Sequence, residues 1–162
     1  MNDFQDQFLN FKSFNPQNSE HLKVQSIVEN DPLVQSFFPE WREITSLSIN
    51  DDSKTYYSYM VSINNEIIAL CTVVFINDEK AVFSQTVLPN YRNHNYANMI
   101  RQSVLKHLYS KGVKEVNGYI RKDNERIIRN LEKNGYKVSE IPGQDLLQVT
   151  YLNEERTSDK NL

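Results

Sequence analysis

The sequence predicts a single α/β domain built on a mixed sheet of about seven strands. Three observations predict it. The chain has 162 residues, the size of one domain with a core that needs no disulfides. Strand-like segments follow one another in its middle, as in an antiparallel meander. After residue 95 helical and strand patterns alternate, which implies parallel strands joined by helical crossovers.

The first segments of the chain show the apolar spacing of a strand and then that of helices. Residues 1–7 are polar and terminal, so we expect them to be unstructured. Residues 8–14 form a plausible first strand. A helix is expected over residues 19–28, capped by Ser19. An Asp-Pro pair, typical of a helix start, opens a short helix over residues 31–39.

The middle of the chain predicts three antiparallel strands. Residues 55–63 are rich in aromatic and β-branched side chains, and residues 66–76 form the returning strand. Asn64 and Asn65 join them, because asparagine tolerates the positive φ angles of a type I′ turn. Residues 81–88 follow as the third strand.

The last part of the chain predicts two helices and three strands. An apolar stripe at helical spacing runs through residues 95–110, and a strand follows at 113–120. A second helix extends from a cap at Asp123 or Asn124 to Gly135. The final strands are expected at 136–141 and 145–152.

Composition excludes several classes of protein. A net charge of −3 disfavours a nonspecific nucleic-acid binder, and no apolar run is long enough to cross a membrane. Cys71 is the only cysteine, so an internal disulfide and a cysteine zinc cluster are excluded, and no metal site is predicted. The N-terminus lacks a signal-peptide pattern. We expect a soluble, cytoplasmic protein with its domain over residues 1–153 and a flexible tail over residues 154–162.

The junction between the third meander strand and the long helix carries the chemistry. The strand ends at Val87 and Leu88, and Pro89 prevents further pairing because it has no amide hydrogen. Short polar residues then lead directly into the helix. Such a junction points free backbone N–H groups at one spot, and the helix dipole adds positive charge there. The sequence therefore predicts a pyrophosphate site, to which Arg92 and His94 add donors.

This junction resembles the acyl-CoA-binding motif of the GNAT superfamily of N-acetyltransferases, V-x-P-x-[YH]-[RQ]-x-x-G-x-[GA]. The matching residues are Val87, Pro89, Tyr91, Arg92 and Ala97. Asn95 stands at the usual central glycine, and Asn93 at a position where glycine is frequent. We expect Asn95 to adopt the left-handed conformation that glycine would take.

Residues 124–136 resemble a later GNAT motif, N-x-x-[AS]-x-x-x-[YN]-[EK]-K-x-G-[FY]. The matching residues are Asn124, Glu132, Lys133, Gly135 and Tyr136. With the order of elements, the resemblance covers roughly residues 8–152. It implies a sheet that is splayed between strands 81–88 and 113–120, with helices on both of its faces.

The resemblance also implies acetyl-CoA as donor and an amine acceptor, either a small molecule or a peptide. The pantetheine arm would pair with the strand edge, the pyrophosphate with the amides of residues 92–97, and a backbone N–H near Val87 or Leu88 would stabilise the oxyanion. Direct attack by a primary amine would then transfer the acetyl group. The cofactor-binding residues implied are Thr86, Val87, Leu88, Arg92, Asn93, His94, Asn95, Tyr96, Ala97 and Asn124.

Two catalytic positions depart from the family pattern. Leu131 stands where a proton-donating tyrosine is common, and Ala81 where many relatives carry a base glutamate. Glu79 is a candidate base. The leaving thiolate would be protonated either by water or by a nearby tyrosine, Tyr136 or Tyr119. The alternative is a catalytically degenerate acyl-CoA-binding or regulatory module. A plain interaction domain would require both motif matches to be accidental.

The sequence also predicts which classes of partner the protein has. We expect no nucleic acid or membrane partner, and a monomer or a homodimer. The aromatic residues Phe37, Phe38 and Trp41 are expected to pack in the core. In the GNAT layout their segment lines the acceptor site, so an aromatic acceptor pocket is the second reading.

Overall fold

The computed structural model describes residues 1–32, 34–35 and 55–151. Three expectations therefore lie outside the described residues. They are the flexible tail over residues 154–162, the packing of Phe37, Phe38 and Trp41, and the end of the helix that Pro32 opens. Pro32 and residues 34–35 are helical, and Gln35 N donates to the carbonyl of Asp31.

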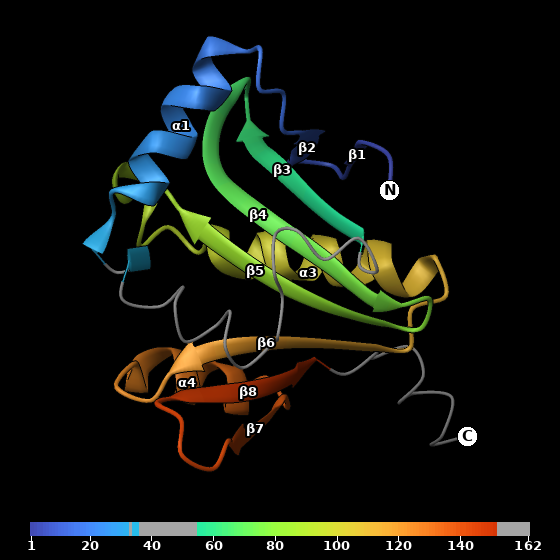
Figure 1. Ribbon diagram of the computed structural model, residues 1–162, viewed down its shortest axis with the longest axis vertical. Coiled ribbons are helices and arrows are strands. Elements are labelled where there is room, and N and C mark those ends of the chain that lie inside the picture. Colours follow the sequence, from blue (N-terminus) through green and yellow to red (C-terminus); the bar gives the residue numbers. More distant parts are fainter. Residues whose placement is uncertain (33, 36–54, 152–162) are drawn as a thin grey trace.

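The described chain forms one eight-stranded mixed sheet in the order β1-β2-β3-β4-β5-β6-β8-β7 (Figure 1). The strands are β1 (Phe4–Gln5), β2 (Asn10–Ser13), β3 (Thr55–Ile63), β4 (Glu66–Asn77), β5 (Lys80–Val87), β6 (Glu115–Arg121), β7 (Lys137–Glu140) and β8 (Leu146–Tyr151). The helices used below are α1 (Ser19–Glu29), the short 3-10 helix η1 (Pro89–Tyr91), α3 (Tyr96–Ser110) and α4 (Glu125–Lys133). The α/β class and the meander of β3, β4 and β5 are as predicted.

The N-terminal segment differs from its prediction, because residues 1–7 are not unstructured. Phe4 and Gln5 pair antiparallel with β2. The turn between the two strands is held by the carboxylate of Asp6, which accepts hydrogen bonds from Phe8 N at 2.8 Å and Leu9 N at 2.7 Å. A turn closed by an aspartate side chain shortens the strand predicted at 8–14 and creates room for an extra one.

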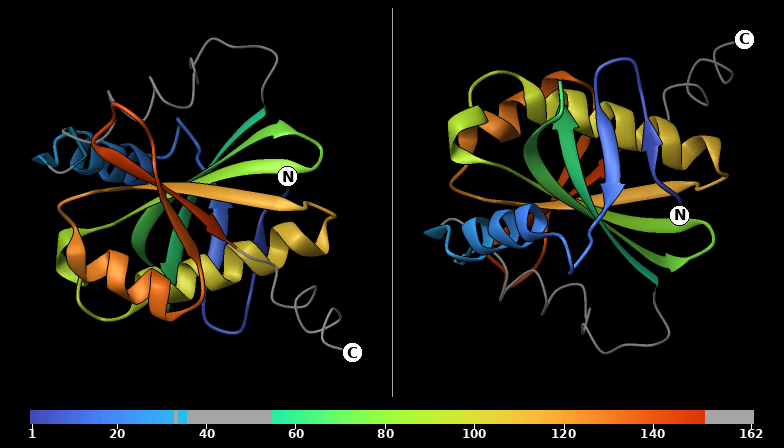
Figure 2. Two further views of the ribbon diagram at one scale, coloured as in Figure 1. Left: turned by 90° about the horizontal axis from the view of Figure 1, so that it is seen from below. Right: turned by 90° about the horizontal axis from the view of Figure 1, so that it is seen from above.

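Helices cover both faces of the sheet, as expected. Figure 2 shows α1 on one face and α3 with α4 on the other. Val24 and Val28 of α1 pack with Met60 of β3, whereas α3 packs with the neighbouring residues Tyr59 and Val61. Successive residues of a strand point to opposite faces, so β3 supplies both layers of the core.

The sheet is splayed between β5 and β6. These parallel strands pair only from Lys80–Glu115 to Val82–Asn117. Beyond that point β5 stays paired with β4, while β6 stays paired with β8 up to Arg121, and the two strands separate (Figure 1). Residues 83–87 of β5 and 118–121 of β6 are called the splay below. The predicted opening of the sheet is confirmed.

The Asn64–Asn65 turn is as predicted, whereas the cap of α1 and the order of the last strands are not. Asn64 and Asn65 have φ angles of 50° and 65°, as the expected turn requires. The cap of α1 is Asn18 and not Ser19, since the Asn18 side chain accepts from Glu20 N and His21 N. The strands β6 and β7 are not neighbours, because β8 returns between them and pairs antiparallel with both.

Within residues 1–32, 34–35 and 55–151, no helix has the length and apolar character needed to cross a membrane. No group of three or more His, Cys, Asp or Glu side chains there is placed to hold a metal ion.

Candidate active site

The edge of β5 that faces the splay is open at Val87. Leu88 N donates to the carbonyl of Ile68 at 2.8 Å, so Leu88 and Ile68 form a hydrogen-bonded pair. In an antiparallel ladder the next residue directs its backbone groups to the opposite side. Val87 therefore presents its N–H and carbonyl to the splay. Of the two oxyanion donors considered from the sequence, only the Val87 N–H points there.

A run of free amides follows the end of β5. In the described part of the chain, the backbone N–H groups of residues 93–98 donate no hydrogen bond to another protein atom, whereas Arg92 N donates weakly to Pro89 O at 3.4 Å. Asn93 and Asn95 both have a φ angle of 66°, as predicted for Asn95. We call these six N–H groups the amide cradle. They lie at the N-terminal end of α3, where the helix dipole favours an anion.

The side chain of Arg92, expected to add a donor to the pyrophosphate site, is bonded to other groups of the protein. Its Nε donates to the carbonyl of Val87 at 3.0 Å, and its guanidinium forms an ion pair with Asp31, whose side chain is only 7% exposed. Arg92 thus joins the end of β5 to the segment that follows α1. His94 is exposed, and its ring lies 5.9 Å from that of Tyr96.

Arg126 is a cation beside the cradle that sequence reasoning missed. It lies in the first turn of α4, and its Nη1 donates to the Asn93 side-chain oxygen at 3.3 Å. Asn124 caps the same helix by accepting from Ile127 N at 3.4 Å. The position of Arg126 two residues after the motif asparagine was the available signal, but only the fold brings α4 to residue 93.

The candidate base Glu79 lies at the closed end of the β5–β6 pair. Its carboxylate accepts a hydrogen bond from Lys114 Nζ at 2.7 Å, and its carbonyl accepts from Lys114 N and Glu115 N. Val87 is at the other end of β5, roughly 26 Å away along an extended strand. This position gives no support to Glu79 as a base near the thioester. Ala81 is fully buried in the core.

Of the two candidate acids, Tyr119 belongs to the part of β6 that is separated from β5, and Tyr136 lies in the core. Tyr136 is 8% exposed, with its ring 5.3 Å from that of Tyr151 on the α3 side of the sheet. Tyr119 lies in the separated part of β6 and packs beside Val82 on the opposite side. Burial, and then the charge of Glu115, raise the pKa of the Tyr119 hydroxyl, so it keeps its proton at neutral pH.

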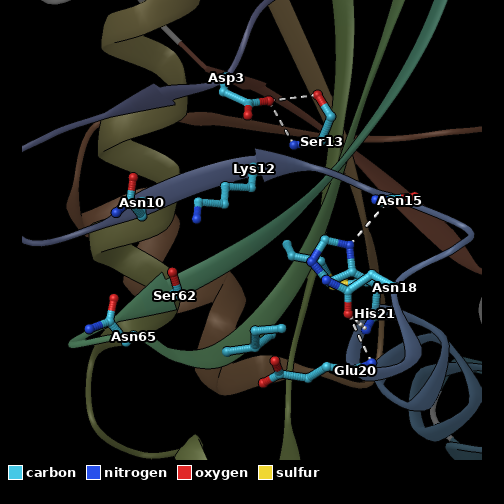
Figure 3. Close-up of a pocket in the computed structure, with 12 residues that line it drawn as sticks. Asp3, Asn10, Lys12, Ser13, Asn15, Asn18, Glu20, His21, Ser62 and Asn65 are labelled. Carbon is cyan, nitrogen blue, oxygen red and sulfur yellow. Dashed lines mark hydrogen bonds between the residues drawn. The ribbon is translucent and has the colours of Figure 1, made fainter.

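A hollow of about 320 Å³ lies away from the splay, between β2, β3 and the start of α1. Its polar groups bond largely to one another (Figure 3): Asp3 accepts from Ser13, and the His21 ring accepts from Asn15 N at 3.0 Å. No residue of the amide cradle or the splay lines it. His21, which carries no ligand pattern in the sequence, is packed here.

Comparison with known proteins agrees with this geometry. Residues 23–136, most of the chain, match the Acetyltransferase (GNAT) family. No curated protein sequence matches the chain.

Many solved structures share the fold, among them three acetyltransferases. The spermidine N-acetyltransferase of Vibrio cholerae, in complex with CoA and spermine, is 17% identical with a TM-score of 0.68, over 94% of this chain and 99% of that one. The N-acetyltransferase PseH of Campylobacter jejuni is 16% identical with a TM-score of 0.62, over 90% and 99%.

A GNAT acetyltransferase of Elizabethkingia anophelis with acetyl-CoA bound is 11% identical with a TM-score of 0.62, over 91% and 100%. At these identities the likeness concerns the fold, whereas the family match concerns the sequence itself. The chain therefore belongs to the GNAT family of acetyltransferases, and this membership confirms the family, the acetyl-CoA donor and the class of activity predicted from its two motifs.

Proposed function

We propose that this chain transfers the acetyl group of acetyl-CoA to the primary amine of a small-molecule or peptide acceptor at the splay. One observation carries the proposal. Six consecutive free amides follow the end of a strand whose neighbour turns away. This arrangement leaves a strand edge for an extended amide-bearing arm and, directly beside it, a site for a diphosphate.

The donor fits this arrangement in two parts. Its diphosphate would lie on the amide cradle, with the charge of Arg126 close to Asn93. Its pantetheine arm would run along β5, where alternation leaves the backbone groups of Gln85 and the N–H of Val87 directed away from β4, while the Val87 carbonyl already accepts from Arg92 Nε. Leu88 would contribute its side chain only, because its N–H is already used within the sheet.

The transfer needs few protein groups. The lone pair of a neutral amine attacks the thioester carbon, and the oxygen that gains negative charge accepts a hydrogen bond from Val87 N–H. The C–S bond then breaks, the thiolate takes a proton from Tyr119, and the new amide nitrogen loses its extra proton to water. Tyr119 recovers a proton from solvent. Leu131, 1% exposed in the core, cannot supply this proton.

Replacing Tyr119 with phenylalanine is expected to lower kcat by about 10- to 100-fold with a small change in KM for acetyl-CoA. General acid catalysis contributes more than this in many enzymes, but a thiolate leaves readily near neutral pH. Steady-state release of free thiol measures the effect. Tyr56→Phe, on the exposed end of β3, is the matched control. An unchanged kcat in Tyr119→Phe would remove Tyr119 from the mechanism.

The proposed function is tested by binding and turnover together. At a 100-fold excess over its Kd, acetyl-CoA is expected to raise the unfolding midpoint by about 5–10 °C. Free thiol is expected to accumulate with at least one member of a panel of polyamines, amino acids and peptides. A thermal shift without thiol release across the panel would instead favour the degenerate acyl-CoA-binding module, as the absence of a tyrosine at Leu131 suggests. No shift would reject both.

A further inference from the structure

We propose that the buried side chain of Arg101 acts through Asn98 to hold Asn95 in its left-handed conformation and so sets the direction of the amide cradle. Arg101 would then be a positioning residue for donor binding. We call the chain of hydrogen bonds from Arg101 through Asn98 to Asn95 the relay. This inference rests on the proposed function, because it assigns the relay a purpose in binding the diphosphate. The three residues lie in and before the first turns of α3.

Asn95 needs support that glycine would not. Its φ and ψ angles of 66° and 10° place a side-chain-bearing residue in the left-handed region. Its side chain makes no capping bond to α3, and its oxygen instead accepts a hydrogen bond from Asn98 Nδ2. The turn at residue 95 decides where the N–H groups of the following three residues point.

Asn98 is held in one orientation. Its Nδ2 donates to Asn95, and its Oδ1 accepts from an Nη2 of Arg101. A guanidinium can only donate hydrogen bonds. If the Asn98 amide were flipped, its NH2 group would face the guanidinium, and two donors cannot bond to each other. Arg101 therefore fixes which end of the Asn98 amide faces Asn95.

Burying the charge of Arg101 costs free energy, and its bond to Asn98 gives a reason for this burial. It is 6% exposed, its guanidinium carbon lies 5.5 Å from the centre of the Tyr136 ring, and its Nε is buried without a hydrogen-bond partner. No carboxylate of the described chain forms an ion pair with it. An apolar side chain would fill this space without the penalty of burying a charge. What an apolar side chain cannot do is donate to Asn98.

The first turn of α3 has a second, independent attachment. Gln85 of β5 donates from Nε2 to the carbonyl of Ala97 at 3.0 Å. That bond fixes the helix to the strand edge but does not reach residue 95. The relay and Gln85 thus restrain different parts of the same turn.

The test compares Asn98→Ala in two backgrounds, the natural chain and Asn95→Gly. In the natural chain, Asn98→Ala is expected to raise the Kd of acetyl-CoA by about 5- to 10-fold, with KM rising and kcat nearly kept. In the Asn95→Gly background the same change is expected to cost less than about twofold, because glycine adopts positive φ without support. Arg101→Met should follow the same pattern. Gln102→Ala, exposed on the same helix, is the control.

An equal loss in both backgrounds, or no loss in the natural chain, would overturn the relay. Thermal unfolding without ligand gives an independent reading, since Asn98→Ala should lower the midpoint by about 2–4 °C in the natural chain and by less in the glycine background. If the unchanged protein bound no acetyl-CoA, the proposed function would fail. The unfolding comparison would still decide whether Asn98 holds Asn95.

Discussion

Replacing Arg92 with glutamate is expected to abolish the thermal shift that acetyl-CoA produces and to destabilise the free protein by about 2–4 kcal/mol. Arg92 pairs with the nearly buried carboxylate of Asp31 and donates to the carbonyl of Val87. Glutamate would set two carboxylates against each other and release the end of β5. Because Arg92 is itself 34% exposed, solvent screens part of this loss. Differential scanning fluorimetry with and without acetyl-CoA measures both effects.

Two further variants separate stability from binding at this position. Arg92→Met removes the guanidinium without adding a negative charge, and should destabilise the free protein by a comparable amount. Combining it with Asp31→Asn removes the buried negative charge as well, so part of the lost stability should return. If Arg92→Met were as stable as the natural chain, the ion pair with Asp31 would have no structural role. A full acetyl-CoA shift in Arg92→Glu would contradict the placement of the diphosphate.

The sequence predicts those features that depend on near neighbours in the chain. The period of residues 55–63 and the two asparagines after them define a hairpin locally. The left-handed Asn95 follows from its place in a motif and from the tolerance of asparagine for positive φ. The class of fold also follows, because a meander followed by alternating helices and strands has few compact arrangements.

What the sequence did not predict depends on side chains that are distant in the chain. The ion pair of Arg92 with Asp31 spans 61 residues, and the hydrogen bond from Arg126 to Asn93 spans 33. No periodicity encodes such pairs. Likewise, Arg101 lies on an otherwise apolar helix face, and only the packing of α3 against Tyr136 shows that its charge is buried.

Replacing Val87 with proline is expected to lower kcat by about 10²- to 10³-fold, the usual cost of one lost oxyanion donor. Proline has no N–H, and the N–H of Val87 points to the splay rather than to β4, so no bond of the sheet is lost. The residue before it, Thr86, is in extended conformation, which is what a following proline requires. The Kd of acetyl-CoA should change much less than kcat.

The matched variant is Val87→Ala, which removes most of the side chain but keeps the N–H. The ratio of kcat between the alanine and proline variants therefore isolates the backbone donor from the packing of Val87 against the core. Circular dichroism and the unfolding midpoint show whether both variants keep the fold. Equal kcat values in two folded variants would place the oxyanion donor elsewhere. A donor that acts on the oxyanion stabilises the transition state more than the bound substrate. If a rise in the Kd of acetyl-CoA accounted for the whole loss of activity, the Val87 N–H would instead pair with the pantetheine arm.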